Sequence, residues 1–500
     1  MEPHVCASQF SENDPAQTVL VFTPGLEVSL ASLHPAGALY EQPFSLFDSV
    51  LHHNNFRATL EEMGCKTMTV SDILLQGLTP ERREKLELLA ADSVTYKPDP
   101  AAPSLPSSLS HFLSTEYKRK VLAAVSPQQL FNYIITRPTV LLRASPNNTS
   151  LVISGVLTKP LGNLVFTRDQ QITTNRGVVL ARLSNHQRQE ETGIMRACFD
   201  AMGVPLVGEI AAPDTLEGGD FLACGHIAMI GAGLRSTEGA ALQLMEKDLL
   251  GVRYFAVFRD TFDHDQDRIH LDCILGPVAD DLCLIDETVT RGDVRTRLVD
   301  LYERTGAAAD VGRYRLIRSQ QPITEFLASI GYSSLPLPHE CQLRYGVNVL
   351  NLGGSRILSV DEESCARLNA WDKFRGAGGM CKVVPFRGIT SMYGSLHCSS
   401  QVLERAARAP ASPRALAVAE LCEDCLLELP TNLPERVLRP HAGTGTRFGS
   451  TVLLARALLD EVYELYASLR AAGLRPRLLL RGHGDETLCP GRNALVAKGR

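Results

Sequence analysis

Several patterns that would place a protein in a membrane, on nucleic acid or around a nucleotide are missing from this sequence. No apolar run approaches the ~18 residues that cross a bilayer. The first ten residues lack the basic and apolar segments of a secretory signal. The net charge of -6 implies no basic face for nucleic acid. Neither GxGxxG nor GxxxxGK(S/T) occurs at an expected strand–helix junction, which argues against a nucleotide site. We therefore predict no membrane and no nucleic-acid partner.

Paired cysteine motifs are also scarce. The chain contains 13 cysteines, an odd number, and they are scattered. The one CxxC, at 422–425, has no second pair to complete a zinc pattern. This usage fits free thiols in a reduced compartment, the cytoplasm or an organelle, better than a disulfide framework.

The chain is long enough for about three domains, and its organisation changes twice along the sequence. Alternating short strands and helices predict an α/β catalytic region formed by 1–71 and 151–405. The helical spacing of apolar positions predicts a helical insert at 72–150. Residues 406–500, rich in Ala, Leu, Arg and Pro, predict a partly helical C-terminal extension that could be poorly ordered, with one helix at 452–472.

A strand–strand–helix–strand unit recurs through the α/β region without identity of residues between units. Such recurrence predicts a closed, pseudo-symmetric α/β array, with an ordinary doubly wound sheet as the alternative. The first 18 residues are polar and are expected to fray. Elements expected near the motifs below are a strand at 164–166, a helix from 184 or 185 to 202, a strand at 271–275 and a helix at 290–303.

The stretch 394–399 contains Cys398 after a turn of small residues, where backbone can approach a substrate closely. A lone cysteine is more often packed than reactive. Three earlier stretches change this assessment, because they supply the carboxylates and the imidazole that a reactive thiol needs. They are 166–169, 217–220 and 270–272.

Three chemistries could use these groups. Asp, His and Cys can bind zinc, but the usual helical ligand spacing is missing. Hydrolysis of an ordinary amide by Cys, His and Asp leaves Asp169 and Glu217 without a function. A guanidinium would use all of them, since this planar cation pairs bidentately with carboxylates and its carbon could face a thiolate. A histidine could then protonate the leaving nitrogen and activate water. The residues alone leave these three interpretations open.

The order and spacing of the motifs resemble the signatures of the arginine deiminase family over about 19–405. The motifs are PLGNLVFTRD at 160–169, LEGGD at 216–220, HLD at 270–272 and HC at 397–398. The insert near 72–150 is also similar to one in that family. The resemblance implies a five-bladed α/β propeller that hydrolyses L-arginine to L-citrulline and ammonia without a metal or an organic cofactor. It also implies a small guanidine as the binding partner, and a homo-oligomer stays open.

The resemblance also implies the residues of the reaction. Cys398 is expected to attack the guanidinium carbon and form a covalent thiouronium intermediate. His270 is expected to act as the general acid and then as the base. Asp169 and Asp272 are expected to bind the guanidinium nitrogens, and Glu217 to assist them and position His270.

Four further residues are expected to bind the rest of the substrate. Asn163 and Phe166 are expected to line the pocket, and Arg188 and Arg235 to hold the α-carboxylate. His397 is expected to have a structural role. Cys273 is expected to point away from Asp272 into the core, because neighbouring residues of a strand face opposite sides.

Two departures from the family pattern bear on substrate choice and on domain structure. The loop 390–398 lacks the arginine that the family carries a few residues before its cysteine, and the segment after about 405 is an addition. Agmatine, a methylated arginine and amidino transfer to an amine are therefore kept as alternatives, as is a non-catalytic arginine-binding protein.

Overall fold

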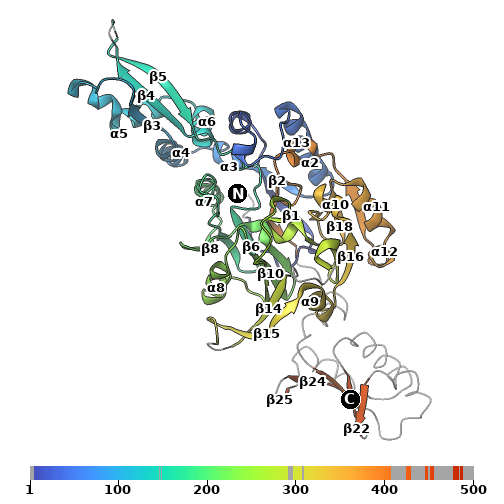
Figure 1. Ribbon diagram of the computed structural model, residues 1–500. Helices are drawn as coiled ribbons and strands as arrows, with labels where there is room; N and C mark the ends of the chain where they lie inside the picture. Colours follow the sequence, from blue (N-terminus) through green and yellow to red (C-terminus); the bar gives the residue numbers. More distant parts are fainter. Residues whose placement is uncertain are drawn as a thin grey trace.

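A computed structural model describes residues 5–145, 147, 149–290, 297–306 and 309–406, and the backbone of five strands beyond them (Figure 1). The predicted α/β class is confirmed. Helices surround the short mixed sheets. The largest hydrophobic core cluster contains side chains from both ends of the region 19–405, such as Val19, Leu60 and Leu403.

Five sheets in the described part of the chain share one pattern, in which an antiparallel pair of strands is followed by a helix and a strand parallel to the second of the pair. The paired residues of neighbouring strands show one antiparallel and one parallel pairing in each of the five sheets. The units, in the order strand, strand, helix, strand, are β6 (Gln171–Thr174), β7 (Gly177–Leu180), α7 (Glu191–Met202), β8 (Leu206–Glu209); β9 (Phe221–Cys224), β10 (Ile227–Ala232), α8 (Glu238–Glu246), β11 (Tyr254–Arg259); β12 (Leu275–Pro277), β13 (Leu282–Asp286), α9 (Ile323–Ser329), β16 (Ser333–Leu337); β17 (Leu350–Asn351), β18 (Arg356–Ser359), α11 (Glu362–Ala370), β19 (Met380–Val383); and β20 (Gln401–Arg405), β1 (Ala16–Val21), α2 (Leu46–Glu62), β2 (Lys66–Thr69).

The second of these sheets is extended by two strands, and here the sequence prediction was wrong. The predicted helix at 290–303 ends in β14 (Leu298–Arg304), which pairs with β11 on one side and with β15 (Tyr314–Pro322) on the other. Val299 and Leu301 are fully buried by this pairing. Burial between two strands outweighs the weak local preference of a charged segment for a helix.

The N-terminal segment is buried, so the prediction that it frays was wrong for residues 8–14. Its backbone bonds to distant strands: the Ser8 amide donates to Leu403 at 2.9 Å, and the Glu12 amide donates to Ala223 at 2.7 Å. Gln9, Glu12, Asn13 and Asp14 are each at most 5% exposed. Polar composition misled the prediction because these side chains have buried partners.

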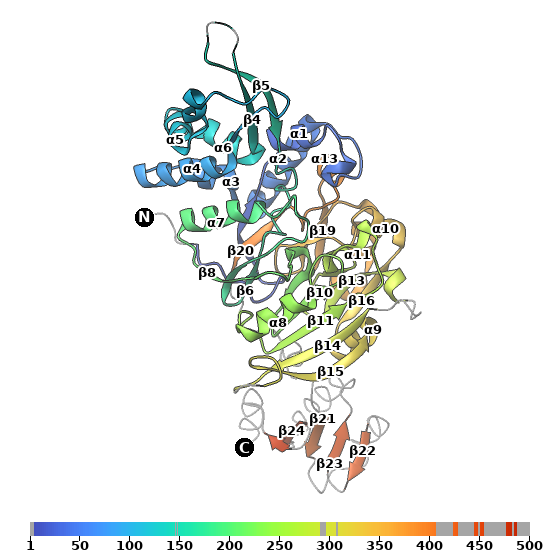
Figure 2. The same cartoon turned by 60° about the vertical axis from the view of Figure 1, so that its left-hand side comes forward.

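The insert projects from one end of the body in both views (Figures 1 and 2). Its three main helices were predicted, and each begins at a Thr or Ser whose side chain accepts from a backbone amide of the first turn. The insert is not wholly helical, however, because it also holds a three-stranded sheet. Its elements are α3 (Val70–Leu75), α4 (Pro80–Ser93), β3 (Thr95–Pro98), α5 (Thr115–Ala123), α6 (Pro127–Thr136), β4 (Pro138–Ala144) and β5 (Leu151–Thr158).

The C-terminal region is described only as strands. They form one sheet in the order β22-β23-β21-β24-β25. The bounds are β21 (Asp424–Glu428), β22 (Gly445–Phe448), β24 (Arg477–Gly482) and β25 (Asp485–Thr487). The predicted helix at 452–472 begins where β23 (Thr451–Leu454) pairs with its neighbours, so its first residues were predicted wrongly. The remainder of that prediction lies outside the described residues.

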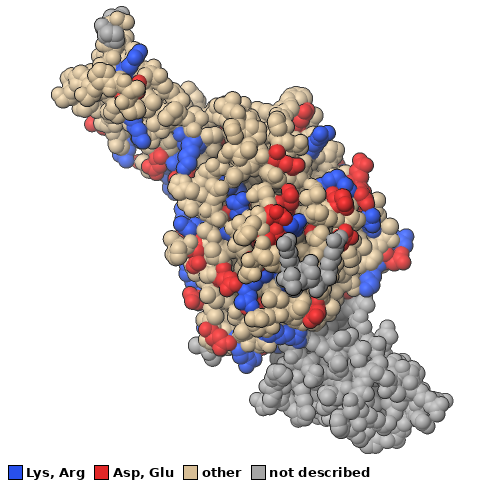
Figure 3. All heavy atoms as spheres, viewed as in Figure 1, with Lys and Arg blue, Asp and Glu red and all other residues tan. Residues whose placement is uncertain are grey.

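The described surface has mixed charge. On the face shown in Figure 3, basic and acidic side chains are interspersed over the body and the insert. Among the described residues, no helix combines the length and apolarity needed to cross a bilayer. Ten cysteines in this part of the chain are free thiols.

Candidate active site

One pocket brings together most of the residues predicted from the motifs. The pocket is lined by Cys398, His270, Asp169, Asn163, Phe166, Arg188 and Arg235, all of which lie in turns and loops outside the strands. Glu217 and Asp272 do not line the pocket. Glu217 contacts the lining residue His270, and Asp272 contacts His397.

Cys398 lies at the end of a turn that leads into β20. Its carbonyl accepts from the Arg168 amide at 3.0 Å, which fixes the nucleophile turn to the segment that carries Asp169. Its Sγ lies 3.5 Å from Oδ1 of Asn348. Burial raises the pKa of the Cys398 thiol well above its ordinary value, and the charges of Asp272 and Asp169 raise it further. The resting thiol is therefore protonated.

His270 is held by Glu217, as predicted from the motifs. The two side chains are 2.9 Å apart, between Nε2 and Oε2, and both are buried. Burial alone would lower the pKa of His270, but Asp169, Glu217 and Asp220 raise it to about 10. Nδ1 is left toward the pocket, 4.0 Å from Oδ1 of Asp169. At neutral pH this residue is an imidazolium, the form that a general acid needs.

The Gly-Gly pair after Glu217 is required by close approach. A Cβ on Gly219 would overlap the ring of His270, and a Cβ on Gly218 would overlap the backbone of Arg168. Asp220, which follows the pair, accepts from Ser236 Oγ at 2.6 Å and from the Leu271 amide at 2.9 Å. The motif therefore places Glu217 and Asp220 on both sides of the His270 segment.

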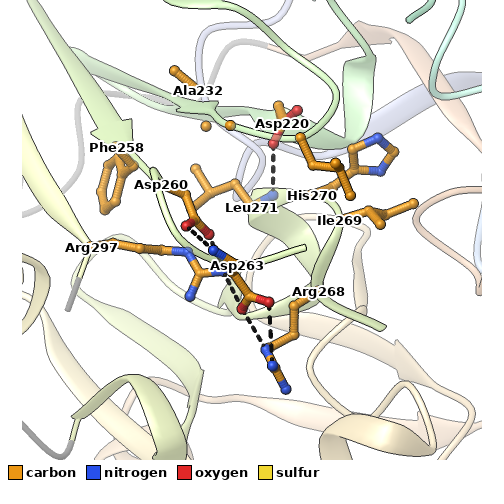
Figure 4. Close-up of a pocket in the computed structure, with 13 residues that line it drawn as sticks. Asp220, Ala232, Phe258, Asp260, Asp263, Arg268, Ile269, His270, Leu271 and Arg297 are labelled. Carbon is orange, nitrogen blue, oxygen red and sulfur yellow. Dashed lines mark hydrogen bonds and ion pairs between the residues drawn. The ribbon is translucent and has the colours of Figure 1, made fainter. Parts of the chain in front are cut away.

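Figure 4 shows how the loop before His270 is anchored. The guanidinium groups of Arg297 and Arg268 converge on Asp263, at 3.1 Å and 2.7 Å, and Arg297 also contacts Asp260. Asp220 meets the Leu271 amide on the far side of the same loop. These charge-assisted contacts hold the loop from two sides.

Asp169 is already paired on one side. Its Oδ2 accepts from Nη1 of Arg188 at 2.9 Å, and Arg188 is also bound by Glu191 at 3.0 Å. Glu191 was not predicted from the sequence, where it is one of several glutamates near the start of α7. Oδ1 of Asp169 is buried and has no hydrogen-bond partner among the described residues. This free acceptor faces the pocket side of His270.

The two arginines predicted to hold a substrate carboxylate differ in how many of their guanidinium donors already have partners. Arg188 is fully engaged by Asp169 and Glu191, and lies 3.9 Å from Glu217. Arg235 donates from Nη2 to Gln266 at 3.1 Å, and its buried Nε has no partner among the described residues. Arg235 is thus the cation in the pocket with a donor to spare.

Asn163 and Phe166 lie in a turn, so the predicted strand at 164–166 was wrong. Leu164 and Phe166 close it through backbone bonds to Leu161 and Asn163. The ring of Phe166 packs against the nucleophile loop at Gly394, where a Cβ would overlap it. The turn therefore fixes one wall of the pocket.

Asp272 contacts His397 instead of the open pocket. Its Oδ2 lies 2.7 Å from Nδ1 of His397, and its backbone carbonyl accepts from Asn348. Asn348 thus touches both Asp272 and Cys398. Asn348 lies outside the four motifs, so it was not among the residues predicted from sequence.

Cys273 lines the pocket, so the prediction that it points into the core was wrong. Residues Leu271–Cys273 form a 3-10 turn and not a strand. The alternation of neighbouring side chains, on which the prediction depended, does not apply in such a turn. Among the described residues, no group of three His, Cys, Asp or Glu side chains is arranged to hold a metal ion.

Comparisons with known proteins identify the family of the chain. A family model described as arginine deiminase matches residues 38–405. The curated arginine deiminase of Halobacterium salinarum is 22% identical over 479 residues, which cover 79% of this chain and 96% of the relative. That of Limosilactobacillus reuteri is 23% identical over 297 residues, covering 56% of this chain and 69% of the relative.

Solved structures with similarity to the chain include DDAH from Pseudomonas aeruginosa in complex with citrulline, with 13% identity, a TM-score of 0.44, and coverage of 77% of this chain and 99% of that one. The N-terminal domain of ArgZ, a cyanobacterial arginine dihydrolase, has 12% identity and a TM-score of 0.45, and covers 78% of this chain and 97% of that one. The family model spans most of the chain and every residue of the pocket. The chain therefore belongs to the arginine deiminase family, hydrolases that act on the C–N bonds of guanidino groups.

Proposed function

We propose that this protein hydrolyses L-arginine to L-citrulline and ammonia, with Cys398 as the nucleophile. The observation that carries the proposal is a pair of buried, unpartnered polar atoms in the pocket of the thiol. Oδ1 of Asp169 can accept from a guanidinium N–H, and Nε of Arg235 can donate to a carboxylate. An amino acid with a guanidinium side chain carries both complementary groups.

The bound cation would also prepare the nucleophile. The negative charges that raise the pKa of Cys398 in the free site are partly neutralised when a guanidinium lies against them. The thiol can then lose its proton, and the thiolate is the reactive form. Molecules without a positive charge would leave the thiol mostly protonated, so they should react with it much more slowly than cationic ones.

The covalent steps follow from these positions. The thiolate adds to the guanidinium carbon, His270 gives its proton to one terminal nitrogen, and ammonia leaves with the electron pair of its C–N bond. The thiouronium that remains is attacked by water, which loses a proton to His270. The C–S bond then breaks as the second proton of the water passes to ammonia, which releases citrulline, ammonium and the thiolate. Glu217 keeps His270 oriented throughout.

The fold supports this use of one central pocket. We infer that the five repeated units are the blades of a closed, pseudo-symmetric propeller formed by residues 1–71 and 151–405, with 72–150 as an insert. Every unit has the same strand pairing, and the sheet of β20, β1 and β2 joins the two ends of this region.

Product analysis with purified protein tests the function. Incubation with L-arginine should give citrulline and ammonia in equal amounts, and agmatine should react much more slowly because it has no carboxylate for Arg235. Ornithine as a product would instead indicate amidino transfer. The Cys398→Ala variant should produce no citrulline, since it lacks the proposed nucleophile.

The matched control is Cys365→Ala, which removes a buried thiol in α11, away from the pocket lining. It should keep the activity of the parent chain. No citrulline above the Cys398→Ala background would contradict the proposal.

A further inference from the structure

The buried N-terminal segment, residues 8–14, forms polar contacts with all five of the repeated sheets. It is therefore placed where the sheets meet. The contacts include Ser8 with Leu403, Gln9 with Thr174, Glu12 with Ala223, Asn13 with Asp280 in the turn between β12 and β13, and Asn13 with Asn351 and Ser355.

One side chain of this segment reaches the catalytic region. Oε1 of Glu12 lies 3.2 Å from Nε2 of His397, whose Nδ1 lies 2.7 Å from Oδ2 of Asp272. The three side chains are at most 3% exposed. His397 precedes the nucleophile, so the row Glu12–His397–Asp272 connects the start of the chain to the guanidinium-binding region.

Both ring nitrogens of His397 face carboxylates, which requires a doubly protonated ring if both contacts are hydrogen bonds. Burial and Arg168 lower the pKa of His397, but Glu12 and Asp272 outweigh them and raise it. Burial raises the pKa of Glu12, yet His397, Arg168 and Arg405 bring it down to about 2. Glu12 and His397 therefore form a buried ion pair.

We propose that Glu12 and His397 are positioning residues that fix the Asp272 carboxylate, whose Oδ1 lies 3.6 Å from Sγ of the pocket residue Cys273, for the substrate guanidinium. The proposal rests on the proposed function of the pocket. Without the donor on Nδ1, the Asp272 carboxylate would lose the contact that fixes its orientation. The charge of Asp272 raises the pKa of the Cys398 thiol, so it acts near the sulfur. In a reoriented side chain this charge would no longer be directed at the bound cation.

Two substitutions at residue 397 separate positioning from simple packing. The amide nitrogen of Asn takes the place of Nδ1, and that of Gln takes the place of Nε2, because the two side chains differ by one methylene. His397→Asn can still donate to Asp272, whereas His397→Gln can donate only to Glu12. Both variants remove the same charge and a similar ring volume.

The probe is a pair of thiol reagents, 2-chloroacetamidine and 2-chloroacetamide. The thiolate displaces chloride from either reagent and forms one C–S bond, with the thiol proton released to solvent. The amidine carries the planar cation of a guanidinium, and the amide is its neutral counterpart. The ratio of their rates at Cys398, measured by mass spectrometry of the intact full-length chain, reports recognition of the cation by the aspartates.

The two variants should differ in this ratio. His397→Gln should lower it about tenfold, the effect of losing one hydrogen bond to a charged group. His397→Asn should keep it within about threefold of the parent value, because the bond to Asp272 is retained. Glu12→Gln should lower it by less than His397→Gln, since it acts one contact further away.

Asn13→Ala is the matched control for destabilisation. Asn13 belongs to the same segment and bonds to Asp280 and Ser355, but it does not touch His397. This variant should lower the melting temperature and leave the ratio unchanged. Equal ratios for His397→Asn and His397→Gln, or a loss in Asn13→Ala as large as in His397→Gln, would overturn the proposal.

The result of this alkylation test does not depend on whether the protein hydrolyses L-arginine. Alkylation of Cys398 needs no turnover, so the ratio can be measured even if L-arginine is not hydrolysed. A parent chain that makes no citrulline but prefers the amidine would refute the hydrolase and leave the test of His397 valid. A parent chain with no preference for the amidine would overturn the positioning proposal itself.

Discussion

At the scale of single residues, the protonation state of Cys398 distinguishes this site from one with a permanently activated thiol. The structure instead places two aspartates and a dry environment around it, and these raise its pKa. Reactivity is thereby linked to the arrival of a cation.

A counterintuitive prediction follows for Asp169→Asn. Removing a negative charge near the sulfur lowers the pKa of Cys398, so more thiolate is present at any pH below that pKa. Iodoacetamide should therefore modify Cys398 several-fold faster at pH 8 than in the parent chain, although hydrolysis of arginine is lost. The rate at Cys398 is measured by peptide mass spectrometry across pH 7 to 10.

Asp200→Asn serves as the comparison, because Asp200 is exposed on α7 and pairs with Lys85. It should leave the alkylation rate of Cys398 unchanged. Slower modification in Asp169→Asn than in the parent would show that the Asp169 charge does not act on the thiol.

The motifs located the pocket residues because chemistry restricts residue type. Cys398, His270 and Asp169 were predicted from sequence and line one cavity. Partners of these groups escaped prediction: Asn348, Glu191 and Glu12 lie far from the motifs or among many similar residues. Their importance depends on contacts that only the fold creates.

At the scale of elements, the loop before Cys398 depends on residue 394 having no side chain. Gly394 packs against the ring of Phe166, and a methyl group there would overlap it. Gly394→Ala should displace the loop and reduce kcat/KM by about tenfold to a hundredfold, as expected when reacting groups move by about 1 Å. Steady-state citrulline formation measures this effect.

Gly193→Ala, in the first turn of α7, is its counterpart, since nothing lies within 4 Å of the added Cβ. Alanine favours the helix by about 0.4–1 kcal/mol. This variant should keep its activity and melt slightly higher. If Gly394→Ala retained full kcat/KM, close packing at the loop would not control the site.

Elements were predicted best where local signals and tertiary packing agree. The capped helices of the insert and the hairpin of β9 and β10 were found from sequence. The strand β14 was not, because its pairing with β11 and β15 is non-local. The turn at 271–273 was missed because a three-residue 3-10 segment has no periodicity to detect.

At the scale of the whole molecule, the catalytic region ends with β20. Arg405 donates to the carbonyls of Glu12, Asp14 and Asn351, and the Ala406 amide donates to Pro15. The family match also ends at residue 405. Truncation after Ala406 should therefore leave a folded chain with most of its citrulline-forming activity.

Truncation after Ser400 is the paired experiment. It removes β20 and with it the antiparallel partner of β1. We expect this shorter chain to be insoluble or to lose cooperative thermal unfolding. Loss of soluble fold on truncation after Ala406 would instead show that the C-terminal region is needed by the body.

The pairing of β1 with β20 also determines when the pocket can form during biosynthesis. Val19 is made long before its partner Val402, because almost the whole described body separates them in sequence. Pairing over such a separation in sequence is slow to form. During translation the first strand therefore has only β2 beside it, and the buried Glu12 has no His397 to meet. The enzyme acquires its reactive cysteine and the neighbours that control it in the same final step, so that an unfinished chain carries no assembled active site.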